Sequence, residues 1–363
     1  MMAEIAVMGH GVVGSGVMEV LISHKDSIAK RAKEEVHVKH ILDLREFPGL
    51  PYSGIFTKDF NRIVNDPQVK IVVEVMGGLE PAYTYVKACL ENGKSVVTSN
   101  KELVAQKGAE LLALAQKNNL NFLFEASVGG GIPIIRPISQ CLAANEMTEI
   151  AGILNGTTNF ILTKMIREGM AFDDALKLAQ QLGYAERDPS ADVEGIDACR
   201  KICILASLAY GTHVYPDSVH TEGITAITRE DVGYAGAWGG VIKLIGEVKK
   251  LENGRIHIQV APMFISRESQ LANVDDVFNG ILVREDTPQD LFLRVAGEGD
   301  SDSLFDKAQQ VFPSAVRLIR KDEKPGEAGF TVGQLSQRQL EERLPALRAL
   351  GVELENRITI ADF

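Results

Sequence analysis

The chain has 363 residues, of which 45% are hydrophobic and 24% charged, a composition typical of a globular protein with two or three domains. Its net charge of −11 disfavours nucleic acids and anionic membranes as partners. No apolar run approaches the roughly 20 residues that span a bilayer, and no signal peptide is recognisable, so we expect a cytoplasmic protein.

The N-terminal segment predicts a strand, a glycine turn and a helix. The turn carries Gly9, Gly11 and Gly14 in the spacing GxGxxG. Such glycines allow a tight turn and the approach of a pyrophosphate to the helix N-terminus, which is typical of dinucleotide binding. Val12 and Val13, inside this motif, are expected to pack inward.

The next predicted strand, EVHVKHILDL, ends at Asp43. A carboxylate there can bond the ribose hydroxyls of NAD and would repel the 2′-phosphate of NADP, whereas the neighbouring Arg45 favours NADP. An ordinary turn residue at the end of a strand is an equally good interpretation of Asp43. The pattern therefore favours NAD only weakly.

Strands and helices continue to alternate to residue 126. VKIVVEVMG, KSVVTSN and LNFLFEASV predict buried strands, with helices from Pro81 and across 103–119 between them. This alternation predicts an α/β fold with a doubly wound parallel sheet. Lys101 follows a strand at the carboxyl edge, where such sheets bind ligands, although a solvated lysine in a first helical turn is the simpler interpretation.

The segment EASVGGGIPII places Glu125 before three consecutive glycines. Glycines leave backbone carbonyls free to point inward, so the segment can form an oxygen cage for a hard cation. It can equally be a hinge between two domains, and the two interpretations are compatible.

The rhythm changes over residues 127–288, for which we predict an α+β substrate domain. A helix is expected through RPISQCLAANE, then a strand EIAGILNG, one helical stretch ending near Gly183 and another from Ala191 to Tyr210. RIHIQVAPMFI and VFNGILVRE predict strands of a mainly antiparallel second sheet.

Asp197 and Lys201 lie four residues apart, on one face of the last of these helices. A surface ion pair of this kind stabilises a helix by only about 0.3 to 0.5 kcal/mol. The following ICILASLAYG is apolar nearly all round, which indicates burial. A lysine at the start of a buried helix, near Glu186, Asp192 and Glu194, favours a functional site.

The last predicted domain, residues 289–363, has the order βαββαβ, as in ferredoxin-like folds and small ligand-sensing ACT domains. The cysteines show no CxxC pair and are expected to be small core residues in a reducing compartment. They are Cys89, Cys141, Cys199 and Cys203.

Together these motifs resemble the homoserine dehydrogenase family. The resemblance rests on GHGVVG, GGLEPA, TSNKELVA, EASVGGGIPII, LNGTTNFILTKM, LGYAERDPSADVEGIDACRK and TEGI, which follow in order over residues 1 to about 285. It implies interconversion of L-homoserine and L-aspartate 4-semialdehyde with NAD or NADP, in threonine and methionine biosynthesis. A homodimer or homotetramer, and an amino-acid effector such as threonine, are the expected partners.

The resemblance also implies residue roles. Lys201 and Lys101 would be catalytic, while Glu186, Asp197 and Asp192 would bind the substrate. A monovalent cation, sodium or potassium, would be held by Glu125, Val128, Gly130 and Ile132. The cofactor would contact Gly9, Gly11, Val12, Val13, Gly14, Asp43, Ser99, Lys101 and Gly183.

The sequence departs from the family in one respect. The family carries a Gly-rich segment with a Pro-Thr-Ala-Ser-Ala helix that closes over the cofactor, whereas here VFNGILVRED passes directly to the C-terminal domain. Either another element replaces that segment, or cofactor binding and turnover are weakened. The alternative function is a non-catalytic or weakly active amino-acid sensor that retains the cofactor fold.

Overall fold

The computed structural model describes residues 2–251, 253–285, 289–297, 300–317, 326–335 and 337–360. The chain forms two compact units. The first comprises Met1–Ala143 and Glu149–Val283, and the second Ala144–Thr148 and Arg284–Phe363. No helix within the described ranges is long and apolar enough to cross a membrane. The domain boundaries at 126 and 288 remain predictions.

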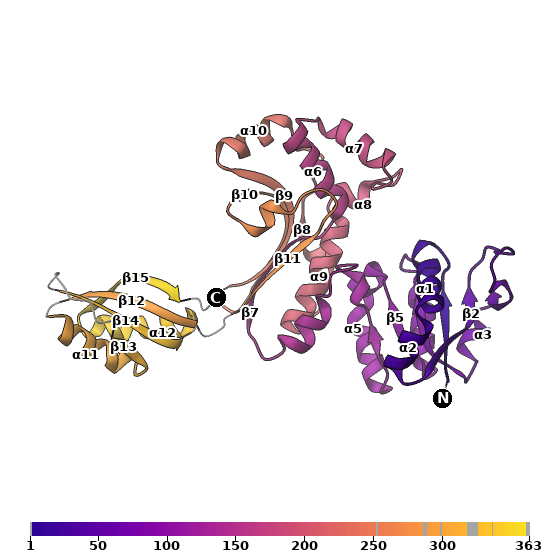
Figure 1. Cartoon of the computed structure of the whole chain (residues 1–363), viewed down its shortest axis with the longest axis horizontal. Helices are drawn as coiled ribbons and strands as arrows, with labels where there is room; N and C mark the ends of the chain where they lie inside the picture. The colour runs from indigo at the N-terminus through magenta and orange to yellow at the C-terminus, as the bar shows by residue number, and fades with distance from the viewer. Residues whose placement is uncertain are drawn as a thin grey trace. The chain divides into compact units, whose positions relative to one another are not determined.

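The first unit begins with a parallel sheet, drawn in indigo to purple in Figure 1, and its strand order is β3-β2-β1-β4-β5-β6. The sheet reverses its direction of growth between β1 and β4, which confirms the predicted doubly wound α/β fold. Its strands are β1 (Met2–Met8), β2 (Glu35–Leu42), β3 (Phe56–Thr57), β4 (Val69–Glu74), β5 (Ser95–Thr98) and β6 (Phe122–Leu123). Its helices are α1 (Val12–Ser23), α2 (Lys25–Ala32), α3 (Asn61–Val64), α4 (Ala82–Glu91) and α5 (Lys101–Lys117).

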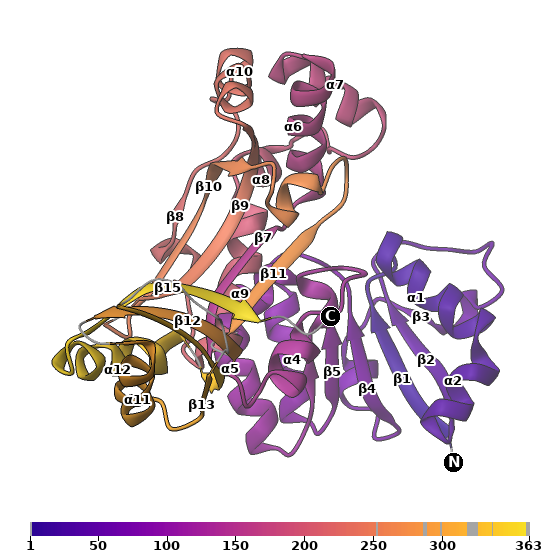
Figure 2. The same cartoon turned by 60° about the vertical axis from the view of Figure 1, so that its left-hand side comes forward.

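A second, mixed sheet follows, with the order β11-β7-β9-β10-β8. The pairs β7–β9 and β9–β10 are antiparallel, and β8–β10 is parallel. The strands are β7 (Met147–Ile153), β8 (His220–Thr221), β9 (Gly240–Lys250), β10 (Ile256–Ser266) and β11 (Gly280–Glu285). The helices are α6 (Gly156–Glu168), α7 (Phe172–Gln181), α8 (Ser190–Val193), α9 (Ile196–Tyr210) and α10 (Arg229–Ala237). Figure 2 shows this sheet with α6 and α9 beside it.

Two expectations about this part of the chain are wrong. The helix expected through RPISQCLAANE is only one short π-helical turn, Pro137–Cys141, beyond which the chain turns. The helix expected from Ala191 is broken at Gly195, which has a φ of 81°, so α8 and α9 are separate. A left-handed residue ends one helix and caps the next, and glycine adopts this conformation without strain.

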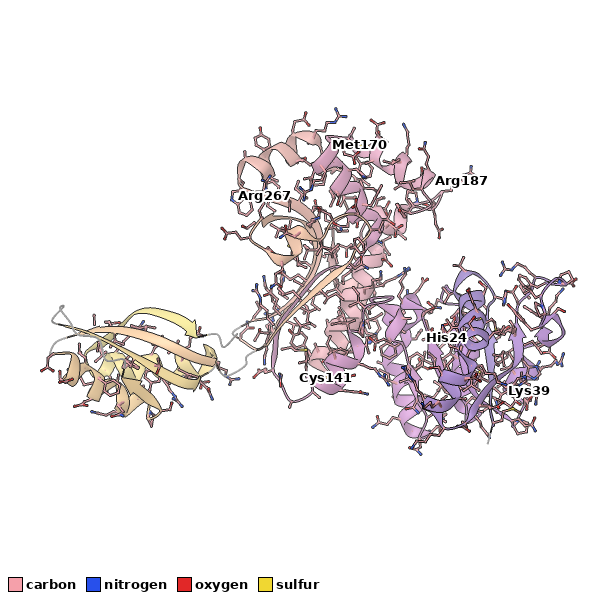
Figure 3. All side chains as sticks on the ribbon, in the orientation of Figure 1. His24, Lys39, Cys141, Met170, Arg187 and Arg267 are labelled. Carbon is pink, nitrogen blue, oxygen red and sulfur yellow. The ribbon has the colours of Figure 1, made fainter. Side chains whose placement is uncertain are left out.

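The cysteine prediction is correct for three of the four residues. Cys89, Cys199 and Cys203 are buried, whereas Cys141 is exposed at the end of the short π-helical turn (Figure 3). Because that segment is not a long helix packed on the sheet, the side chain of Cys141 has no core to enter.

The second unit has the element order β12 (Gln289–Gly297), α11 (Ser301–Val311), β13 (Ala315–Arg317), β14 (Glu327–Leu335), α12 (Gln337–Ala349) and β15 (Val352–Ile360). The sheet order is β13-β14-β12-β15, and its pairs are antiparallel. Residues of the strands and both helices form one apolar core, with Leu304, Phe312, Phe330 and Leu347 fully buried. Its role as an ACT-like sensor remains a prediction.

Candidate active site

The glycine loop between β1 and α1 is shaped by close backbone contacts. Gly9 has a φ of 102°, and a Cβ at Gly14 would lie 2.2 Å from the carbonyl oxygen of Gly9. Gly11 is the N-cap of α1, makes no side-chain cap and faces open space. The first amides of α1 are therefore free to bind an anion such as a pyrophosphate.

The expectation that Val12 and Val13 pack inward is wrong. Their side chains are 91% and 52% exposed, whereas Gly14 and Met18 of the same helix are buried. Side chains in a first helical turn point toward the N-terminus, so these two face the open side of the loop. An exposed position there is compatible with contact to a cofactor.

Asp43 follows β2 and is held by several hydrogen bonds. Its carboxylate accepts from the backbone amide of His10 at 2.8 Å and from the guanidinium of Arg45 at 2.9 and 3.0 Å. The bond from Arg45 is the main reason that the pKa of Asp43 lies well below its usual value. A pocket of about 280 Å³ adjoins this pair and is also lined by Phe47, Phe56 and Lys58.

A polar network lies at the carboxyl ends of β4 and β5. Glu74, fully buried, accepts from the hydroxyl of Thr98 at 2.5 Å, and burial raises its pKa. Asn100 caps α5 through the amide of Leu103 at 3.1 Å and donates to the carbonyl of Gly78 at 2.6 Å. This network fixes the start of α5, where Lys101 is the first residue.

Lys101 and Lys201 share the carboxylate of Asp197. Nζ of Lys101 is paired with one oxygen of Asp197, and Nζ of Lys201 lies 2.8 Å from the other. Asp197 is buried, which by itself would raise its pKa, but the two ammonium groups outweigh burial and lower it. Lys201 also donates to the carbonyl of Leu154 at 2.7 Å. The two predicted catalytic lysines are thus brought together.

Asn155 joins the predicted substrate residues Asp192 and Asp197. It follows β7 and caps α6, accepting from the amide of Thr158 at 2.8 Å. Its amide nitrogen donates to Asp192 at 2.7 Å and to Asp197 at 2.9 Å. Burial raises the pKa of Asp192. Two carboxylates are therefore held side by side close to two ammonium groups.

Other predicted residues lie outside this cluster. Glu186 is exposed in the loop between α7 and α8, and its backbone carbonyl accepts a hydrogen bond from the side chain of Gln180. Gly183 is exposed in the same loop, with a φ of 78°. Ser99 is half-buried at the end of β5. The roles assigned to these three residues remain predictions.

Glu125 holds the glycine loop that follows it. Its carboxylate accepts from the backbone amides of Ile134, Ile135 and Arg136 at 2.7 to 2.9 Å. A Cβ at Gly129 would lie 2.5 Å from the carbonyl oxygen of Ile132, so the close turn requires glycine. Within the described chain, nothing donates a hydrogen bond to the carbonyls of Val128, Gly130 and Ile132.

Two features of the site were missed in the sequence. The first is Asn155, which has a signal in the sequence, because an Asn-Gly-Thr-Thr after a strand is a typical helix cap. The ion pair between Glu102 and Arg200, at 2.8 Å, joins α5 to α9 beside the lysines. Sequence spacing gives no signal for a contact between residues so far apart.

Family models match most of the chain. A model described as homoserine dehydrogenase matches residues 133–303, and one described as the NAD-binding domain of homoserine dehydrogenase matches residues 9–125. The homoserine dehydrogenase of Lactococcus lactis is 38% identical over 91% of this chain and 77% of its own length. That of Pseudomonas aeruginosa is 41% identical over 87% of this chain and 72% of its own length.

Solved structures that resemble this chain are also homoserine dehydrogenases. A homoserine dehydrogenase from Thiobacillus denitrificans has a TM-score of 0.75 at 31% identity, with 100% of this chain and 99% of that chain covered. A hyperthermophilic archaeal homoserine dehydrogenase in complex with NADPH has a TM-score of 0.66 at 25% identity, with 96% and 98% covered. The fold is thus shared with solved homoserine dehydrogenases.

Proposed function

This chain belongs to the homoserine dehydrogenase family, and on that premise we propose how its side chains serve the reaction. The activity is the NAD(P)-dependent interconversion of L-homoserine and L-aspartate 4-semialdehyde. Nothing in the comparisons favours a non-catalytic protein. The observation that carries the proposal is that Lys101 and Lys201 meet at the buried carboxylate of Asp197.

Lys201 is the proton donor and acceptor for the substrate oxygen. An ammonium group has three N–H donors, and two of those of Lys201 are bound by Asp197 and by the carbonyl of Leu154. The third is left for the substrate oxygen. In the direction of reduction the ammonium stabilises the developing negative charge and donates a proton, and in oxidation the amine takes that proton back.

Lys101 supports the same oxygen from the cofactor side. It begins α5 at the carboxyl edge of the parallel sheet, the edge at which open α/β sheets bind nucleotides. A bound nicotinamide supplies or accepts the hydride at its C4. Asp197 keeps both lysines in place and compensates part of their charge, so that the unfavourable position of Lys101 at a helix N-terminus is tolerated.

Asp192 and Asp197 form the acidic side of the substrate pocket. Asn155 holds them side by side, and a substrate ammonium group would offset their mutual repulsion. Glu186, exposed on the loop before α8, is proposed to reach the same ammonium group once substrate is bound. These acidic groups favour an amino-acid substrate over an uncharged alcohol.

The test is turnover in variants of Lys201. Purified protein with homoserine and NAD or NADP is expected to form NAD(P)H at neutral to alkaline pH, which absorbance measures. Lys201→Ala should lower kcat by at least about 100-fold, a typical contribution of general acid–base catalysis, and leave cofactor affinity unchanged. Lys164→Ala is the control, because Lys164 also pairs with a carboxylate four residues away, on α6. If kcat is the same in both variants, Lys201 has no catalytic role and only forms an ion pair on its helix.

The dinucleotide is proposed to be NAD or NADP without strict preference. Arg45 occupies both oxygens of Asp43, so this carboxylate is not free to repel a phosphate. Arg45 and Lys58 border the adjoining pocket and carry the positive charge that a 2′-phosphate requires. If Arg45 turns to a phosphate, Asp43 becomes free to bond a ribose hydroxyl.

A sodium or potassium ion is proposed at the loop 128–132. The carbonyls of Val128, Gly130 and Ile132 receive no hydrogen bond from described residues, and oxygen ligands suit such ions. The carboxylate of Glu125 already accepts hydrogen bonds from three backbone amides. It would therefore contribute to ion binding through its negative charge and its remaining lone pairs. The ion would order the loop without touching the reacting atoms.

Assembly and regulation are proposed from exposed features. Tyr234, Trp238 and Phe264 are 70%, 59% and 50% exposed beside the second sheet, which favours burial of this surface in a homodimer or homotetramer. The second unit is proposed as an ACT-like domain that binds threonine or a related amino acid. A cytoplasmic location remains a prediction.

A further inference from the structure

The helices α5 and α9 border a second pocket within the first unit. Its volume is about 340 Å³, and its walls include Val104, Gly108 and Leu112 of α5, Ile204 and Leu208 of α9, and His213 beyond the end of α9. Figures 1 and 2 both show α5 and α9 side by side. None of the groups assigned to the substrate or to the dinucleotide lines this pocket.

The pocket wall is mostly apolar, and its polar side chains are those of Ser207 and His213. Ser207, also in the wall, donates to the carbonyl of Cys203 at 2.7 Å and accepts from the amide of Val214 at 2.9 Å, so its hydroxyl is occupied. Nε2 of His213 is buried and has no hydrogen-bond partner among the described residues. Burial lowers the pKa of His213, which favours the neutral ring. A buried polar atom without a partner costs stability, and a ligand can satisfy it.

Gly108 keeps the pocket open. It lies in the interior of the 17-residue helix α5, where glycine is less stable than alanine because it loses more backbone freedom on folding. A Cβ there would lie 3.4 Å from Cγ1 of Val104 and 4.0 Å from Cε1 of His213, so the backbone tolerates a side chain. Glycine at this position makes the helix less stable, but it leaves the pocket open, whereas a longer side chain would fill it.

We propose that this α5–α9 pocket is a binding site for small neutral ring compounds that carry one N–H or O–H group. The walls named above offer no charged side chain, which disfavours amino acids and nucleotides. A cavity of roughly 150 Å³ holds benzene, so the larger volume here suits a two-ring molecule. The ligand's N–H or O–H group would donate to Nε2 of the neutral His213.

Occupation of the pocket bears on catalysis through the two helices. Lys101 begins α5, and Lys201 lies one turn before Ile204 on α9. A ligand wedged between the helices changes the distance between the two lysines, and hence kcat more than KM. This second part rests on the proposed function, whereas binding itself does not.

Indole and benzofuran are suitable probes, because they have nearly the same shape and only indole carries an N–H group. Titration calorimetry and thermal unfolding of the full chain, without substrate, should show saturable indole binding. His213→Phe keeps a ring but removes Nε2, and should weaken indole about threefold to tenfold, the value of one hydrogen bond, while benzofuran is unaffected. Failure of indole to bind below its solubility limit would overturn the proposal.

A side chain introduced into the pocket tests whether the probes bind there. Gly108→Leu should abolish binding of both probes, and Gly108→Ala should weaken it if the leucine variant does not fold. Gly233→Leu is the control, because Gly233 lies in α10 and faces open space. Undiminished binding to a folded Gly108→Leu protein would place indole elsewhere and contradict the proposal. Indole binding without a change in kcat would overturn the coupling to the lysines and retain the binding site.

Discussion

At the scale of single residues, Asp197 governs the electrostatics of the site. It is buried and faces the ammonium groups of Lys101 and Lys201 as well as the amide of Asn155. One negative charge therefore holds two positive ones, and the excess positive charge is available where a substrate oxygen becomes negative. A substitution of Asp197 would leave two cations without their partner, so it would act on both lysines at once.

Arg45 provides a test of cofactor choice. If Arg45 holds a 2′-phosphate, Arg45→Ala should lower kcat/KM for NADP by at least about tenfold, since bonds to charged groups contribute roughly 1.5 to 3 kcal/mol. The value for NAD should change little. Initial rates with each dinucleotide measure this. Arg62→Ala, on α3, is the control for loss of one surface positive charge. If kcat/KM falls equally for both dinucleotides, Arg45 does not bind the 2′-phosphate and only holds Asp43 in place.

Residue-level prediction succeeded where sequence spacing determines the contact. The four-residue interval predicts that Asp197 and Lys201 share a helix face, and they are paired. The contact between Lys101 and Asp197 depends on the packing of α5 against α9, which spacing does not determine. The apolar character of Val12 and Val13 predicts burial, but their position in the first helical turn leaves them exposed.

At the scale of elements, the break between α8 and α9 positions the site. It lets α9 begin at Ile196, so that Asp197 enters the first turn, where the helix dipole favours a carboxylate. Helical periodicity predicted one continuous helix, because a single glycine in an apolar pattern is a weak signal. The parallel strands were predicted well, whereas β9 and α10 were missed. β9 has a buried lysine, Lys243, as its fourth residue, and this charge interrupts its apolar pattern.

Gly195 should not tolerate a side chain. Its φ is 81°, and a Cβ would lie 3.2 to 3.3 Å from atoms of Thr221, Glu222 and Val260. Gly195→Ala is therefore expected to lower the free energy of unfolding by about 1 to 3 kcal/mol, measured by urea denaturation. Gly169→Ala is the control, because Gly169 is left-handed as well but has open space around it. If Gly195→Ala lowers the free energy of unfolding less than Gly169→Ala does, the residues around Gly195 accommodate a methyl group and the prediction is wrong.

The loop after β6 is the proposed site of a sodium or potassium ion, and salt-dependent stability tests it. Potassium or sodium chloride should raise the Tm above that in tetramethylammonium chloride of equal ionic strength, because the larger cation does not fit between carbonyls. Gly129→Ala, which brings a methyl group against the carbonyl of Ile132, should remove the difference. Gly131→Ala is the control, since Gly131 faces open space. The same Tm in all three salts would argue against the ion.

At the scale of the whole molecule, the sequence predicted the parallel sheet and the order of elements in the last 75 residues. Local patterns of strands and helices suffice for both. Sequence patterns did not predict that the second unit recruits Ala144–Thr148 from the middle of the chain. Glu146 pairs with Arg338 at 3.5 Å, and Thr148 donates to the carbonyl of Arg284 at 3.2 Å. Such contacts depend on tertiary packing.

The effector proposal is tested on the full chain. Threonine should raise the Tm saturably and lower the rate of homoserine oxidation, because a ligand that binds the folded second unit stabilises it. D-threonine serves as the control of equal composition and charge. If the two enantiomers give the same Tm and the same rate, the second unit has no stereospecific site for threonine and is a structural or dimerising module.

The composition of the second unit also affects how the protein folds during synthesis. Residues 144–148 leave the ribosome well over a hundred residues before Arg284, the first residue of the other segment. At typical translation rates this delay is on the order of ten seconds, during which residues 144–148 lack their partners in the second unit. A nascent chain of this protein therefore carries these residues without their partners while the second segment of its first unit, Glu149–Val283, is synthesised. In that interval it is most exposed to chaperones and to misassembly.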